Sequence, residues 1–189
     1  MTLNTSTVLT VLTLLLLPHL ATAQGNLVVN GGFDTDISGW ILTNGASYNS
    51  LFGNPAGSVA LYNPGSTDAS TASQEINSLT PGILYAVSGD YMRGAISGVT
   101  DSGFGVALDG VYLFETTALT NYNWYNFIFD YTATSTSALL SLSTLIGEKG
   151  NGYTIDNIAM YAVPEPSSLC LTGLGGILSA MLFRKRRKG

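Results

Sequence analysis

The clearest structural signal in this chain lies in residues 104–115, FGVALDGVYLFE. Two apolar runs, residues 104–108 and 111–115, flank the dipeptide Asp109-Gly110. Asp-Gly between two such runs is typical of a β-hairpin with a type I′ turn, because both turn positions need a positive φ. The stretch therefore predicts two antiparallel strands joined by a tight turn.

Similar short runs recur along the middle of the chain, separated by Gly, Asn, Asp, Ser and Pro. At a spacing of roughly ten residues they are typical of an all-β sandwich. Thr80-Pro81-Gly82 predicts a type II turn before one of the longer runs. Besides the hairpin, we expect strands at residues 27–29, 40–42, 58–62, 72–76, 83–91, 125–131, 138–145 and 153–161.

The N-terminus has the layout of a secretory signal peptide. Residues 8–17 are apolar or Thr, Pro18 follows, and Ala21-Thr22-Ala23 forms a small-x-small cleavage site. We therefore expect residues 1–23 to be removed and residues 24–162 to form the exported domain. An uncleaved N-terminal anchor is the alternative.

The exported part is strongly acidic. Residues 24–163 hold eleven acidic residues against two basic ones, Arg93 and Lys149, a net charge of −9. This charge excludes nucleic acid as a partner, because phosphate binding requires clustered Lys and Arg.

The residue types needed for several kinds of catalysis are missing from the exported part. The only His, His19, lies in the predicted signal peptide, and the only Cys is Cys170 near the C-terminus. Ser-His-Asp and Cys-His catalysis and zinc sites with imidazole or thiolate ligands are therefore excluded. A carboxylate pair of the glycosidase kind stays open, although acids in Asn- and Gly-rich turns are usually turn formers. We expect neither an enzyme nor an organic cofactor.

Three segments of the domain carry a family resemblance. They are NLVVNGGFDTDISGW at residues 26–40, ASQEI at 72–76 with PGILYAV at 81–87, and YTIDNI at 153–158. In this order they resemble jelly-roll domains of the galactose-binding and carbohydrate-binding-module type. The resemblance covers nearly all of residues 26–162 and implies a jelly-roll β-sandwich.

Domains of this type often hold one structural calcium ion where the first turn meets the last strand. The resemblance implies that the Gly32 carbonyl and the carboxylates of Asp34 and Asp156 bind it, and oxygen ligands suit calcium. The alternative is that Asp34 forms an Asx turn and that Asp156 pairs with a backbone N–H. The resemblance also places Trp40 and Trp124 in the core.

Aromatic residues at loops and strand ends are the candidates for a glycan-binding face. Among them we select Tyr91 and Tyr122 as ligand-binding residues. Tyr is also common in ordinary strands, so the pattern alone leaves both interpretations open. The full set is Tyr48, Phe52, Tyr62, Tyr91, Tyr112, Tyr122 and Tyr125.

The C-terminus, VPEPSSLCLTGLGGILSAMLFRKRRKG at residues 163–189, has three parts. A Pro-Glu-Pro box precedes an apolar run at 167–183, which is near the lower length limit for a membrane helix. The basic tail should stay cytoplasmic. The box comprises Val163, Pro164, Glu165 and Pro166, and the tail comprises Arg184, Lys185, Arg186, Arg187 and Lys188.

This arrangement resembles the PEP-CTERM sorting signal. The resemblance implies processing by an exosortase, transient anchoring in the membrane, and a final location at the cell surface or in the extracellular matrix. A plain single-pass anchor is the alternative. We therefore expect a non-enzymatic exported protein that binds exopolysaccharide, or else a structural or adhesive matrix protein without a defined sugar ligand.

Overall fold

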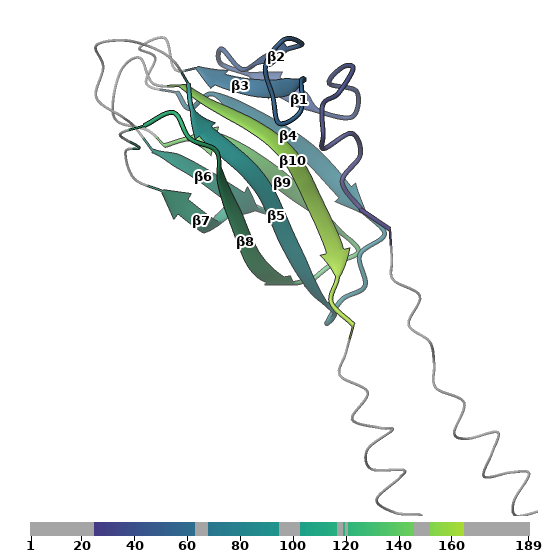
Figure 1. Cartoon of the computed structure of the whole chain (residues 1–189). Coiled ribbons are helices and arrows are strands. Elements are labelled where there is room, and N and C mark those ends of the chain that lie inside the picture. The colour runs from purple at the N-terminus through teal and green to yellow at the C-terminus, as the bar shows by residue number, and fades with distance from the viewer. Residues whose placement is uncertain are drawn as a thin grey trace, which may run out of the picture. The chain divides into compact units, whose positions relative to one another are not determined.

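The computed structural model describes residues 25–62, 68–94, 103–116, 119, 121–145 and 152–164. These residues form two antiparallel five-stranded sheets packed face to face (Figure 1). Sheet 1 has the order β1 (Ile41–Thr43), β4 (Thr71–Asn77), β9 (Ser137–Thr144), β6 (Phe104–Leu108) and β7 (Val111–Thr116). Sheet 2 has the order β2 (Ser47–Asn49), β3 (Ser58–Tyr62), β10 (Gly152–Ala162), β5 (Leu84–Arg93) and β8 (Tyr125–Thr132).

The predicted all-β sandwich is confirmed, and most of the expected strands lie within one or two residues of their predicted bounds. The strand expected at residues 27–29 is wrong. Val28 N donates to the Asn26 side chain and Val29 N to Gln74 Oε1, so side chains replace a strand ladder there. Strand β2 was not predicted, because its three residues lie among turn formers and are too few to show a period.

Both predicted turns are present. Asp109 and Gly110 have φ values of 50° and 79°, as a type I′ turn requires. Gly82 has a φ of 86°, and Ile83 N donates to Thr80 O over 3.1 Å, which identifies the type II turn.

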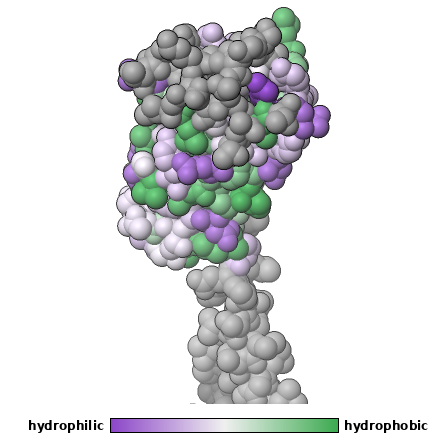
Figure 2. Space-filling model, turned by 90° about the vertical axis from the view of Figure 1, so that its left-hand side faces the viewer, coloured by the Kyte–Doolittle hydropathy of each residue, from purple (hydrophilic) through white to green (hydrophobic). Residues whose placement is uncertain are grey.

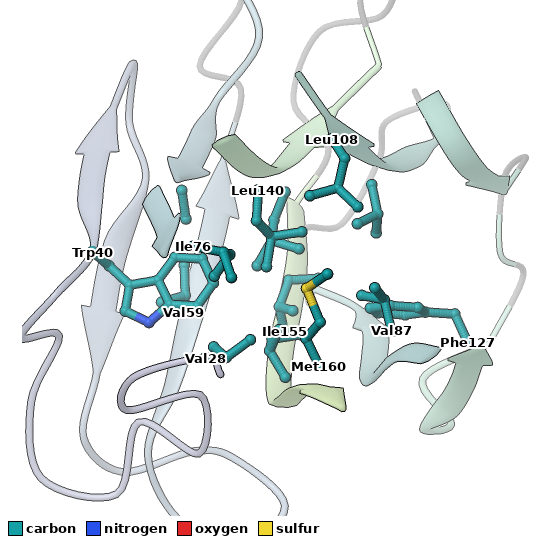
Figure 3. Close-up of a cluster of buried hydrophobic side chains, with 14 of the residues drawn as sticks. Val28, Trp40, Val59, Ile76, Val87, Leu108, Phe127, Leu140, Ile155 and Met160 are labelled. Carbon is teal, nitrogen blue, oxygen red and sulfur yellow. The ribbon is translucent and has the colours of Figure 1, made fainter. Parts of the chain in front are cut away.

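The core lies between the two sheets, where apolar side chains from both layers converge (Figure 3). Trp40 is buried there as predicted, and its Nε1 donates to Val29 O and Asn30 O. The prediction that Trp124 fills the core is wrong. Trp124 is half-buried just before β8 and stacks on Phe52, with 6.2 Å between the ring centroids.

Several predicted features lie outside the described residues. They are the signal peptide at 1–23, Glu165 and Pro166 of the box, the membrane helix at 167–183 and the basic tail at 184–188. Within the described part of the chain, no helix has the length and apolar character needed to cross a membrane.

Candidate functional site

Two neighbouring rows on the outer face of sheet 1 are built mainly from small side chains. The strand registers align Ile41, Ser73, Ser141, Ala107 and Tyr112 in one row across all five strands. A second row runs through Thr43, Thr71, Ser143, Gly105 and Glu115. In these rows the face is therefore low over β4, β9 and β6 and carries hydroxyl groups on β4 and β9. Larger side chains stand on the two edge strands.

Tyr112 is held on this face by two contacts. Its hydroxyl lies 2.9 Å from Ser143 Oγ on β9, although Tyr112 is on β7 and β6 separates these strands. The ring must therefore lie across β6, where Gly105 makes room for it. A Cβ at position 105 would come within 2.7 Å of the Tyr112 ring and 2.9 Å of Leu145.

The ring of Tyr112 is thus fixed in position while the residue remains 44% exposed. A fixed aromatic ring beside hydroxyl groups can stack on an apolar ligand surface and hydrogen-bond its polar edge. On the side of the domain that carries β7 and β8, hydrophobic and hydrophilic residues are interspersed in small patches (Figure 2).

A second group of polar residues lies on sheet 2 and centres on Asp156 of β10. Asp156 is fully buried, and its carboxylate accepts hydrogen bonds from Asn54 N over 2.5 Å and Asn157 N over 2.7 Å. Burial raises the pKa of the Asp156 carboxyl, and the negative charges of Asp34 and Asp90 raise it further, while the two backbone hydrogen bonds lower it. The pairing of Asp156 with a backbone N–H, expected as the alternative to calcium binding, is therefore present.

The three residues expected to bind calcium lie in one region. Asp34 is close enough to Asp156 for their charges to interact, and a Cβ at Gly32 would meet Asp34 Oδ2 at 3.4 Å. Their oxygen donors suit a hard cation. In the described ranges, however, no three His, Cys, Asp or Glu side chains are grouped to hold a metal ion, so main-chain carbonyls would have to complete the ligand set.

The loop between β2 and β3 is fastened over this region. Asp90 of β5 accepts hydrogen bonds from the side-chain amides of Asn54, Asn126 and Asn157 at 3.1, 3.2 and 2.9 Å. These bonds join the loop to β5, β8 and β10. The network is well explained as a structural one, since its amides and carboxylates bond to one another.

The two tyrosines selected as ligand-binding residues differ in exposure. Tyr91 was expected to be exposed, and this is wrong: it is 7% exposed and packs against Phe104, Phe114, Tyr125 and Phe127. It shares the inward phase of β5 with Tyr85 and Val87. Tyr122 is 53% exposed, and the Arg93 guanidinium lies 5.8 Å from its ring centroid.

Tyr112 was only one of several aromatic candidates in the sequence. The signal that could have distinguished it is Gly105, because a Gly inside a strand often marks a close approach by another group. Ser143 could not have been paired with it from sequence, since the contact spans 31 residues.

Comparison with known protein families identifies the PEP-CTERM protein-sorting motif over residues 162–187. The chain carries this sorting motif. The motif marks the protein for exosortase-dependent export and sorting to the cell surface or matrix. Comparison with curated proteins found no significant match.

Solved structures show the fold of the domain. The chain is similar to the CBM22-1 xylan-binding domain of Xyn10C from Paenibacillus barcinonensis, with 17% identity, a TM-score of 0.53, and coverage of 77% of this chain and 100% of that one. It is also similar to the Stig cyclase Fisc from Fischerella sp. TAU, with 18% identity, a TM-score of 0.57, and coverage of 77% and 100%.

A third similar structure is the enzymatically active domain of tailspike protein 4 from bacteriophage CBA120. Here the identity is 16% and the TM-score 0.52, and the match covers 73% of this chain but only 21% of the tailspike chain. Because these identities are low, the likeness concerns the fold. The domain is a jelly-roll β-sandwich of the kind found in carbohydrate-binding modules.

Proposed function

We propose that this protein is a non-enzymatic component of the cell surface or exopolysaccharide matrix, and that its β-sandwich binds glycan on the outer face of sheet 1. The observation that carries the proposal is the position of the Tyr112 ring. The ring lies across β6 over Gly105, and its hydroxyl is within hydrogen-bond distance of Ser143. The carbohydrate-binding modules that share the fold support the same class of ligand.

The chemistry of the face suits a neutral sugar polymer. Ser and Thr hydroxyls in the two rows can both donate and accept hydrogen bonds, as sugar hydroxyls can. Glu115 is the only acidic residue in these two rows. The ring of Tyr112 supplies the apolar surface on which the C–H side of a sugar can rest.

Retention on the host's own exopolysaccharide tests this proposal. Tyr112→Ala should lose most of the retention, and added free sugar should release the unmodified domain. Tyr161→Ala is the matched control, because Tyr161 is 45% exposed on sheet 2, almost the same as Tyr112. Equal retention of both variants would overturn the proposed site, and the absence of saturable binding would favour an adhesive role without a sugar ligand.

Tyr122 is a second proposed contact for the glycan. Tyr122 as a residue is more exposed than Tyr112, and the nearby Arg93 guanidinium donates to Leu119 O over 3.1 Å, which holds the loop. Tyr122→Ala should weaken retention less than Tyr112→Ala, because no hydrogen bond within the described part of the chain fixes the Tyr122 hydroxyl.

We further propose that the chain is anchored transiently in the inner membrane through residues 167–183, with residues 184–188 on the cytoplasmic side. Glu165→Ala should leave the full-length protein in the membrane, while the unmodified chain is shortened near residue 165 and released. Mass spectrometry of the membrane and extracellular fractions distinguishes these states. Full-length unmodified protein in the membrane would instead indicate a plain anchor.

We also propose that Asp34, Asp156 and the Gly32 carbonyl bind one structural calcium ion, which would neutralise the buried Asp156 carboxylate. The interacting charges of Asp34, Asp90 and Asp156 support this proposal.

A further inference from the structure

The last strand of the domain is held on both sides almost to the start of the sorting motif. On one side, β3 pairs only with the first part of β10, up to Ile155. Beyond that point residues 26–27 take its place. Asn26 Oδ1 accepts from Met160 N, and Leu27 N donates to Met160 O, both over 2.9 Å.

On the other side, β5 pairs with β10 to its end. Ala162 is the register partner of Tyr85, and Val163 N donates to Leu84 O over 2.8 Å. The sorting motif begins at residue 162. The first two residues of the motif are therefore bonded into sheet 2, and no spacer separates the folded domain from the Pro-Glu-Pro box.

This overlap has a consequence for the processing enzyme. Enzymes that cut peptides usually bind several residues as an extended strand and take up their backbone hydrogen bonds. Residues 161–163 cannot offer the groups that face β5 while they are paired with it, and residues 26–27 hold Met160 just before them. Cutting of a folded chain then follows the population of the locally opened form.

We propose that detachment of the end of β10 from β5 controls processing at the box, so that the enzyme's binding surface includes residues 161–163 freed from sheet 2. Cutting breaks one peptide bond, whose acyl carbon passes to water or an amine acceptor while the new amine takes up a proton. The rate of this step depends on the fraction of molecules in which the strand end is detached.

An engineered disulfide tests the proposal by locking the strand end. Ala86 and Tyr161 are register partners on β5 and β10, and paired Cα atoms in such ladders are close enough for a disulfide. Ala86→Cys with Tyr161→Cys, in a Cys170→Ser background, should be processed at least tenfold more slowly in host membranes when oxidised. Reductant should restore the rate.

A second pair of variants loosens the strand without changing the motif. Asn26→Ala removes the side-chain bonds to Met160 N and Ile158 O and should raise the processing rate roughly three- to tenfold. Asn44→Ala is the control, because it removes a single side-chain bond to Ala69 O at the turn between β1 and β2. It should leave the rate unchanged.

A spacer of four Gly and Ser residues inserted after Tyr161, which leaves the motif at 162–187 intact, should raise the rate as well and make it insensitive to the disulfide. The proposal is overturned if the oxidised lock and Asn26→Ala are both processed at the unmodified rate. All these outcomes are independent of glycan binding, because Tyr112 and its face are unchanged in every variant.

Discussion

The hydroxyl of Tyr112 reaches across β6 to within 2.9 Å of Ser143 Oγ. Only a residue without a side chain can lie beneath the ring, and position 105 is Gly. Three strands thus cooperate to hold one aromatic ring on the outer face of sheet 1. The proposed glycan site depends on this arrangement, which single substitutions can dissect.

Gly105→Ala should displace the Tyr112 ring, since the new Cβ would overlap it at 2.7 Å. Retention on polysaccharide should fall toward that of Tyr112→Ala, with a loss of about 1–3 kcal/mol in the free energy of unfolding from overpacking. Gly25→Ala is the control, because nothing lies within 4 Å of a Cβ there. Unchanged retention of a folded Gly105→Ala domain would contradict the role of the ring.

Ser143→Ala and Tyr112→Phe each remove the same hydrogen bond, which is worth about 0.5–1.5 kcal/mol. Each single variant should bind glycan a few-fold more weakly than the unmodified domain. The double variant should bind it no more weakly than either single variant. Dissociation constants for the three variants measure this coupling. Additive losses would mean that the hydroxyl contacts the sugar directly and is not positioned by Ser143.

Calcium should raise the thermal unfolding temperature of the domain relative to EDTA. At a calcium concentration about 100 times the dissociation constant, the free energy of unfolding should increase by about 2.7 kcal/mol. Asp156→Asn should abolish the gain, whereas Asp130→Asn, an exposed control on β8, should keep it. Equal unfolding temperatures of the unmodified domain in calcium and in EDTA would contradict the proposed calcium site.

Protonation of the Asp36 carboxylate should make the domain less stable in acid. Hydrogen bonds from Ser38 N, from the Ser38 hydroxyl and from Asn30 lower the pKa of the Asp36 carboxyl below its usual value of 3.8. Its contribution to stability is therefore present above about pH 3.8 and is lost as the pH falls through the lowered pKa. Urea unfolding from pH 7 to pH 2 should show that the difference between the unmodified domain and Asp36→Asn disappears at the acid end. A difference that does not change with pH would assign the effect to packing.

The parts of the fold that were predictable depend on local backbone chemistry. Asp109-Gly110 predicted its turn because few other residue pairs accept a positive φ twice in succession. The Pro81-Gly82 turn follows from the same kind of constraint. The strand prediction for residues 27–29 failed because the Gln74 side chain bonds to the backbone N–H and carbonyl of Val29, 45 residues away in the sequence.

The candidate site was predictable only in part, because it depends on which face of each strand turns inward. Tyr91 shares the phase of Val87, and that phase faces the core. The polar Ser88 and Asp90 occupy the opposite phase of β5, but the prediction followed the aromatic ring of Tyr91 near a strand end. The pairing of Tyr112 with Ser143 required the register of β7, β6 and β9, which no local pattern encodes.

The most direct test of the central claim is an NMR titration of the isotope-labelled domain with oligosaccharides from the host's exopolysaccharide. The account predicts that the largest chemical-shift changes occur at Gly105, Tyr112 and Ser143 and in the neighbouring rows of sheet 1, and that they saturate. Saturable changes confined to sheet 2, around Asp90 and Asn126, or no saturable change on either face, would contradict it.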